Sequence, residues 1–216
     1  MENFYIILVV ILFALAISDL VVGVSNDAVN FLNSAIGSKA APKWLIFLMA
    51  SIGVLIGATF SNGMMEVARK GIFHPDMFYF SEIMIIFLAV MITDVILLDM
   101  FNTFGMPTST TVSIVFELLG AAVTVSIVKI KAAGASVAME LYKYINSDKA
   151  LAIITGILVS VIIAFTVGAI VQYITRIIFS FNYRKSMKYF GSLYGGLAIT
   201  AITYFMLIKG INGSTY

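Results

Sequence analysis

The sequence lacks cysteine altogether, and its 216 residues include only one histidine and three prolines. Without cysteine the protein can form neither disulfides nor thiolate metal sites. The single histidine, together with the absence of a metal-ligand cluster, a catalytic Ser–His pair or a dinucleotide-binding loop, argues against an enzyme. Charged residues are also scarce, at 11%, and a net charge of +2 gives no indication of nucleic-acid binding.

Apolar residues make up 61% of the chain, and the mean hydropathy is +1.06. Several runs reach the length of about 20 residues that crosses the hydrocarbon of a bilayer. We expect an all-α polytopic membrane protein with six hydrophobic segments, at residues 4–24, 44–60, 81–101, 106–128, 150–175 and 189–208. The connecting segments are not linker-like, so a single transmembrane domain over residues 1–216 is the simplest organisation. The 13 Lys and Arg residues divide almost evenly between the two predicted sides and indicate no orientation.

A row of amides and one carboxylate follows the first hydrophobic segment. Asn26, Asp27, Asn30 and Asn33 lie in residues 25–37, directly after apolar residues 4–24. A carboxylate at bilayer depth costs at least about 2.5 kcal/mol, and such residues usually serve something polar that passes by them. Their helical spacing predicts that residues 25–37 form the second half of a broken helix.

A second polar region joins two apolar runs at residues 102–107, where the sequence has no Lys, Arg, Asp or Glu. Backbone outside a helix is tolerated at depth only where protein or a wet cavity surrounds it, so this joint is a candidate re-entrant tip. Pro107 suits the first position of a helix. The first turn would then contain the hydroxyl side chains Thr108, Ser109, Thr110 and Thr111. Unpaired N–H groups and hydroxyls at a helix start can hold an oxyanion without Lys or Arg.

Five carboxylates within or beside the segments have no basic partner nearby in sequence: Asp19, Asp27, Asp94, Asp99 and Glu117. Oxygen donors without a countercharge suit Na⁺ or H⁺. We expect a cation site at Asp27 with the Asn26 and Asn30 amides, and Asp94 and Glu117 are further candidates. The alternative, which is strongest for Asp19 and Asp99 near segment ends, is that the carboxylates are simply hydrated at an interface.

At these two regions the sequence resembles the inorganic phosphate transporter family, the sodium- or proton-coupled phosphate permeases. Residues 25–30 and 37–38, Ser-Asn-Asp-Ala-Val-Asn and Gly-Ser, resemble the family signature Gly-Ala-Asn-Asp-x-x-Asn followed by Gly-Ser. Residues 105–112, Gly-Met-Pro-Thr-Ser-Thr-Thr-Val, resemble the second signature, Gly-Leu-Pro-x-Ser-Thr-Thr-His. The two motifs occur in the family's order and beside hydrophobic segments, so the match is fairly specific.

The resemblance implies two inverted repeats, each with a broken helix and a re-entrant hairpin, around a phosphate site at the midplane. Residues 1–128, with both signatures, would be the first repeat, followed by additional spans at 150–175 and 189–208. Carried over by position, Asn26, Asp27 and Asn30 would contribute to phosphate and Na⁺ binding. The hydroxyls of residues 109–111 would cradle phosphate. Na⁺ would serve as the coupling ion, with no other cofactor, in a multi-pass protein of the cell (inner or plasma) membrane.

Three residues depart from the family pattern. Val24 replaces a glycine, Val112 a histidine and Phe116 a glycine, and the histidine change weakens any case for histidine-mediated proton coupling. Each signature also occurs once here, whereas the family carries each twice. The chain therefore resembles the N-terminal repeat only. We expect its partner to be the second repeat of the same transporter or another copy of this chain, and the resemblance suggests a homodimer.

The leading hypothesis is secondary active transport of inorganic phosphate across the bilayer, driven by Na⁺. One alternative keeps the architecture and changes the cargo to sulfate or the driving ion to H⁺. Another is an accessory membrane subunit that does not itself transport.

Overall fold

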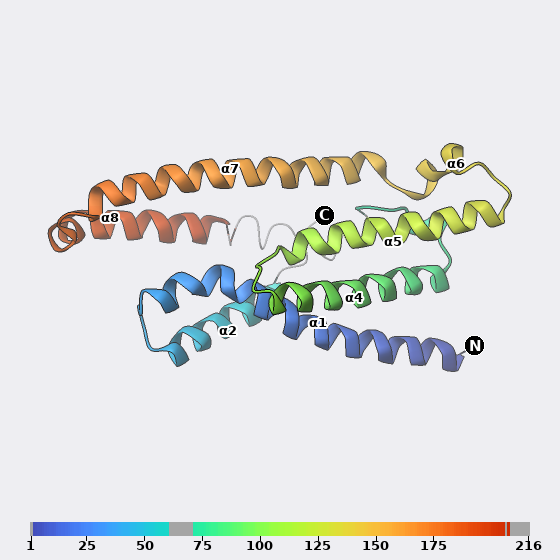
Figure 1. The fold of residues 1–216 in the computed structure, drawn as a ribbon, viewed down its shortest axis with the longest axis horizontal. Coiled ribbons are helices and arrows are strands. Elements are labelled where there is room, and N and C mark those ends of the chain that lie inside the picture. The colour runs from blue at the N-terminus through green and yellow to red at the C-terminus, as the bar shows by residue number, and fades with distance from the viewer. Residues whose placement is uncertain (1, 61–70, 206, 208–216) are drawn as a thin grey trace. The chain divides into compact units, whose positions relative to one another are not determined.

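The computed structural model describes residues 2–60, 71–205 and 207, and these residues form helices with no extended strand (Figure 1). One isolated antiparallel bridge joins Phe73 and Ile145. The elements are α1 (Glu2–Gly37), α2 (Lys43–Phe60), the 3₁₀ turn η1 (Pro75–Met77), α4 (Phe80–Thr103), α5 (Thr110–Ala132), α6 (Val137–Tyr144), α7 (Ser147–Phe179) and α8 (Tyr183–Tyr204). The all-helical prediction is confirmed for the described residues.

Among the described residues, four helices are long and apolar enough to cross a bilayer: α1 from Phe4, α4, α5 and α7. They contain the predicted segments 4–24, 81–101 and 150–175 and most of 106–128. The segment at 44–60 corresponds to α2, which is apolar but shorter. The segment at 189–208 overlaps α8, which is less apolar because its first two turns contain Arg184, Lys185 and Lys188. Residues 206 and 208 of the segment lie outside the described part. Six spans are therefore not confirmed.

The chain divides into two compact units, which are described separately. The first contains the described parts of residues 1–55 and 65–150, and the second those of 56–64 and 151–216. In the second unit α7 and α8 are joined by a short turn, where Asn182 accepts a hydrogen bond from the Lys185 amide at 3.3 Å. The rings of Phe179 and Tyr194 meet edge to face, with centroids 5.7 Å apart. The single domain expected from the sequence stays a prediction.

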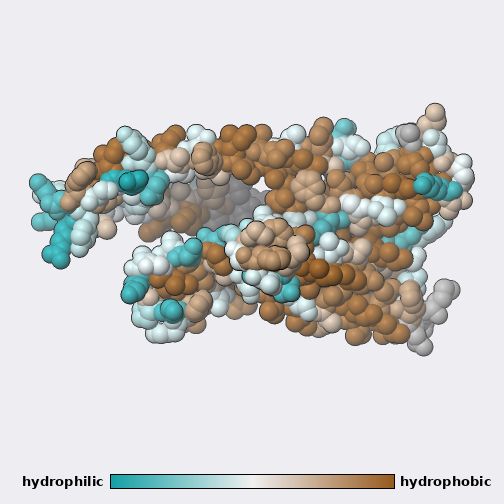
Figure 2. Space-filling view, viewed as in Figure 1, coloured by the Kyte–Doolittle hydropathy of each residue, from teal (hydrophilic) through white to brown (hydrophobic). Residues whose placement is uncertain are grey.

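In the first unit α1 packs on α4, α4 on α5 and α5 on α6. Four of the five buried residues of α4 recur every four positions, at Ile86, Val90, Asp94 and Leu98, which is the spacing of one narrow helix face. Ala122 and Ser126 lie on the buried face of α5, where small residues let helix backbones approach closely. Figure 2 shows that apolar residues also cover much of the surface, with hydrophilic residues gathered at helix ends, as expected of helices in lipid.

The predicted break in the first helix is wrong, because α1 is one continuous helix of 36 residues. Ser25 sits within it and donates its hydroxyl to the Val21 carbonyl at 2.7 Å, a bond that serine makes inside a helix. The helix ends at Gly37, followed by Lys39 in the left-handed region at φ 55. A helix of this length extends about 54 Å, well beyond the roughly 30 Å of hydrocarbon.

The joint between α4 and α5 is a tight helical hairpin. Gly105, at φ 67, ends α4: its amide bonds to the Asn102 carbonyl at 3.1 Å, and that of Met106 to Phe101 at 2.9 Å. This paired arrangement is the Schellman motif, which needs the left-handed conformation that glycine adopts without strain. The arms have 24 and 23 residues, each a full span by length, so a re-entrant depth stays a prediction.

Candidate functional site

The Asn26 side chain links α1 to the α4–α5 joint. It is 2% exposed, and its Oδ1 atom accepts a hydrogen bond from the Thr108 backbone N–H at 3.0 Å. Its Nδ2 atom donates to Asn102 Oδ1 at 2.9 Å. Asn102 in turn donates its Nδ2 to the Val22 carbonyl at 3.1 Å. The first polar region and the joint, about 80 positions apart in sequence, are therefore in direct contact.

Asp27 makes the second link between these regions. The Thr110 hydroxyl donates to Asp27 Oδ2 at 3.1 Å. Asp27 follows Asn26 directly on α1, and Thr110 lies two residues after Thr108. Gly23 lies one turn earlier, and a Cβ built there would meet Leu98 and Thr110 side-chain carbons at 3.7 Å, an ordinary contact. The carboxylate is thus held against the first residue of α5.

The first turn of α5 begins later than the sequence predicted. Ser109 is the N-cap, with its hydroxyl accepting from the Val112 amide at 3.4 Å, and the helix proper starts at Thr110. The prediction that Pro107 occupies the first helical position is wrong. Ser109 caps the helix instead, because its hydroxyl can accept a hydrogen bond from an amide of the first turn, whereas a proline side chain has no acceptor. The free amides of this turn, its hydroxyls and the positive end of the helix dipole lie together beside Asp27.

The remaining predicted residues lie around this contact with differing exposure. Thr108 is half-buried, whereas Ser109, Thr111 and Asn30 are exposed. No described hydrogen bond or ion pair at these residues involves Lys or Arg. The structure thus brings Asn26, Asp27, Thr108 and Thr110 together, and leaves groups on the rim open to a ligand or to another part of the protein.

A second polar cluster lies between α4 and α5, about one helical turn beyond Thr110 along α5. The Ser113 hydroxyl is 2.8 Å from both Asp94 Oδ1 and Glu117 Oε1. A hydroxyl has one hydrogen and can donate to only one of these oxygens. The other contact needs a hydrogen from a carboxyl group or a cation shared with the oxygens. Asp94 is 1% exposed, so this requirement arises in an environment with little water.

Asp19 adds a third carboxyl group to the second cluster from α1, close enough to Asp94 for the two groups to interact electrostatically. Its Oδ1 atom and the Oε2 atom of Glu117 are buried without a hydrogen-bond partner. Asp99 is exposed on another face of α4 and does not take part. The sequence left the roles of Asp19 and Asp99 open, and the structure separates them. Asp19, Asn102 and Ser113 are the three members of the polar clusters absent from the predicted site.

Within the described ranges, no three His, Asp or Glu side chains gather closely enough to form a metal site. A cation site at Asp27 would therefore depend on amide, hydroxyl and carbonyl oxygens as well as its carboxylate. Such mixed oxygen sets are chemically suited to a hard monovalent cation. The predicted Na⁺ site thus has a compatible donor set, and stays a prediction.

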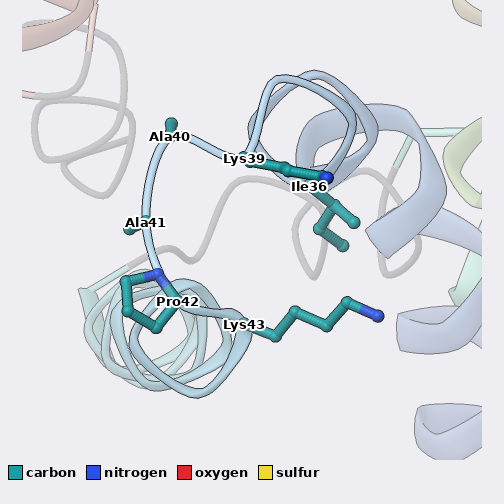
Figure 3. A pocket seen from close by; sticks show the side chains of 6 residues that line it. All are labelled: Ile36, Lys39, Ala40, Ala41, Pro42 and Lys43. Carbon is teal, nitrogen blue, oxygen red and sulfur yellow. The ribbon is translucent and has the colours of Figure 1, made fainter.

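Two hollows lie beside the second half of α1. One, of about 560 Å³, is formed at the α1–α2 turn by Ile36 and residues 39–43; Figure 3 shows Lys39 and Lys43 extending toward the same side of it. The other, of about 240 Å³, has a mainly apolar lining that includes Asn33 and Phe47. Neither includes Asn26, Asp27 or the first turn of α5, so the contact between the two signature regions lies outside both.

Comparison with known proteins decides the family. Residues 23–214, most of the chain and both polar regions, match the phosphate transporter family. The chain belongs to this family. Its four long apolar helices accordingly make it a multi-pass membrane protein, in a family of transporters rather than of enzymes. The resemblance seen at the two signatures is confirmed.

Two archaeal relatives are named "putative phosphate permease". The protein from Thermococcus kodakarensis is 29% identical over 202 residues, covering 88% of this chain and 45% of the relative. The protein from Pyrococcus furiosus is 27% identical over 199 residues, covering 88% of this chain and 44% of the relative. The chain thus spans slightly less than half the length of these relatives. No solved structure matches it.

Proposed function

We propose that this chain forms part of a secondary transporter that carries inorganic phosphate across the membrane, with Na⁺ as the coupling ion. The observation that carries the proposal is the contact of Asp27 with Thr110, because it joins a carboxylate to the first turn of a helix. That turn offers amides, hydroxyls and a positive dipole to an anion. The carboxylate offers a cation site directly beside it.

Charge balance favours a co-bound cation. Phosphate near −2 beside an ionised Asp27 is repulsive unless positive charge is present, and no described contact at these residues supplies a basic side chain. A Na⁺ ion at Asp27, with oxygens from Asn30 or Thr110, would neutralise part of this charge. Anion and cation would then favour each other's binding, which is the basis of coupled transport. Thr108, Ser109, Thr110 and Thr111 would hold the phosphate.

The exposed rim suggests that the site needs a second half. Asn30, Ser109 and Thr111 are exposed in the described unit, and the archaeal relatives are about twice as long as this chain. We propose that a second repeat of the same transporter, or another copy of this chain in a homodimer, supplies the missing contacts. Rocking of one half against the other would expose the site to each side in turn.

The test is uptake of labelled phosphate by proteoliposomes containing the full natural protein, with and without an inward Na⁺ gradient. We expect uptake to require the gradient and Asp27→Asn to abolish it. Asp99→Asn is the matched control, because Asp99 is an exposed carboxylate on α4. Sulfate competition at several pH values separates the cargo alternatives. Normal Na⁺-dependent uptake by Asp27→Asn would contradict the cation site, and absence of uptake by wild type would favour an accessory role.

One observation supports proton coupling as a second candidate. The Ser113 hydroxyl lies 2.8 Å from two carboxylates and can donate to only one of them, so a bound proton would complete the network. A proton gradient in place of the Na⁺ gradient, applied to the same proteoliposomes, distinguishes the two. Uptake driven by the proton gradient alone would favour proton coupling over Na⁺ coupling.

A further inference from the structure

Three hydrogen bonds form an unbroken series from the joint to α1. The Thr108 amide donates to Asn26 Oδ1, Asn26 Nδ2 donates to Asn102 Oδ1, and Asn102 Nδ2 donates to the Val22 carbonyl. The distances are 3.0, 2.9 and 3.1 Å. We call the two side chains, Asn26 and Asn102, the amide latch.

The orientation of the amide latch is fixed from both ends. A backbone N–H can only donate, so the Asn26 atom that faces Thr108 must be its oxygen. A backbone carbonyl can only accept, so the Asn102 atom that faces Val22 must be its nitrogen. The middle bond is then Asn26 nitrogen to Asn102 oxygen. The two end groups thus agree on one arrangement, and reversing either amide would break two bonds.

The amide latch also accounts for the joint's backbone. The Gly105 and Met106 amides bond within α4, Pro107 has no N–H, and Ser109 starts the cap of α5. Thr108 is therefore the joint residue whose amide is satisfied by another helix. Its position fixes where Thr110 begins α5, and Thr110 is the residue that reaches Asp27.

Both polar atoms of the Asn26 side chain are used by the protein, and the residue is 2% exposed. An oxygen and a nitrogen engaged in this way are poorly placed to bind a ligand as well. Opening the pair to bind phosphate would leave buried polar groups without partners, which is strongly unfavourable. The neighbouring Asp27 accepts a hydrogen bond from Thr110 and takes no part in this series of amide hydrogen bonds.

We propose that Asn26 and Asn102 are positioning residues, which hold the first turn of α5 against Asp27 and do not themselves bind phosphate or the coupling ion. This inference rests on the proposed transport function and changes the role expected of Asn26 from its sequence motif. It also assigns a role to Asn102, which touches the site only through Asn26.

The test is a double-mutant cycle on the full natural protein, with Asn26→Ala, Asn102→Ala and the double variant in proteoliposomes. If the two amides act as one unit, each single variant raises the phosphate KM by a similar factor, of roughly tenfold. The double variant then matches the singles within about twofold. Asn102→Asp, which keeps the size and loses the donor to Val22, should behave like Asn102→Ala. Thr103→Ala, on the adjacent exposed residue, is the control.

If Asn26 instead bound phosphate directly, its loss would raise KM strongly, Asn102→Ala would stay within about twofold of wild type, and the effects would multiply. A weak effect of Asn102→Ala, or effects of the two substitutions that multiply, would overturn the inference while leaving phosphate transport intact. The same four proteins in detergent give a second readout, since their melting temperatures should show the same non-additivity. Absence of uptake by wild type defeats the proposed function, and additive melting shifts defeat the amide latch, so the two failures are distinct.

Discussion

The two ends of the α4–α5 hairpin are fastened to their surroundings by different chemistry. At the joint, neutral amides and hydroxyls tie the helices to α1, with Asp27 as the charged member. At the opposite end, Lys129 of α5 pairs with Glu82 of α4 at 2.7 Å and donates to the Met77 carbonyl at 2.9 Å. Its ammonium also lies 4.3 Å from the ring centre of Tyr79.

The difference favours the joint, rather than the Lys129 end, as the place for the proposed ligand site. Around Lys129, charge is neutralised by Glu82 and the cation is covered by aromatic rings, so the site is complete in itself. At the joint, the helix dipole, the open amides of α5 and the Asp27 carboxylate have no such neutralising partner among the described contacts. The Lys129–Glu82 ion pair closes one end of the hairpin, whereas at the joint the proposed site leaves polar groups for a ligand.

The largest effect should come from the contact that joins the two halves of the candidate site. Thr110→Val keeps the branched shape and removes the hydroxyl that donates to Asp27. Hydrogen bonds to charged groups contribute about 1.5–3 kcal/mol, so we expect phosphate uptake to fall by roughly 10- to 100-fold. Thr124→Val is the control, since its hydroxyl bonds only within α5, to the Gly120 carbonyl. Equal uptake by the two variants would mean that the contact of Thr110 with Asp27 does not contribute to transport.

Much of the candidate site could be predicted from residue chemistry alone. Amides and a carboxylate next to an apolar run are costly in a bilayer, and this cost alone predicts a functional role for Asn26 and Asp27. The charge-free joint and its hydroxyls drew attention to Thr108 and Thr110 in the same way. Their proximity could not be derived, because sequence spacing says nothing about which helix packs on which.

The errors have a common physical cause. The row of polar residues favours a break in the helix, yet α1 continues because its buried amide, Asn26, is satisfied from outside by Asn102 and Thr108. The sequence places Asn102 in the joint and gives no sign of its contact with Asn26. Pro107 was placed by its preference for a helix start, although the competing preference of Ser109 for the cap prevailed. In each case a tertiary contact or a neighbouring residue decided between two locally acceptable structures.

The second polar cluster offers a further test of whether the joint side of the α4–α5 hairpin, and not the Lys129 end, serves transport. Glu117→Gln provides an N–H donor to the Ser113 oxygen, so that Ser113 can donate to Asp94 and both contacts are satisfied. We expect the folded protein to be retained while the half-saturating concentration of the coupling ion, Na⁺ or H⁺, rises by roughly 2- to 10-fold. Uptake titrated with each ion measures this shift. No change with either ion, as for Asp99→Asn, would make the cluster purely structural.

The opposite end of the hairpin should affect stability and not transport. Lys129→Met removes the ion pair with Glu82, the bond to Met77 and the contact with Tyr79. Both charged side chains are about one-fifth exposed, so partial screening limits the loss to about 1–2 kcal/mol. Thermal unfolding in detergent measures it, with Lys131→Met as control on the exposed neighbour. A changed phosphate KM in Lys129→Met would show that this end also contributes to binding.

The smallest effect concerns two helix ends that make the same turn with different residues. Gly105 ends α4 at φ 67, and Lys39 ends α1 at φ 55, where a side chain is strained. Lys39→Gly should raise stability by about 0.5–1 kcal/mol, and Gly105→Ala should lower it by about 1 kcal/mol, by the same conformational term with opposite sign. Gly105→Ala should also slow uptake, because Gly105 sets the joint that positions Thr108, whereas Lys39→Gly should leave the phosphate KM unchanged. Equal uptake losses in the two variants would mean that the turn at residue 39 is as tightly linked to transport as the joint.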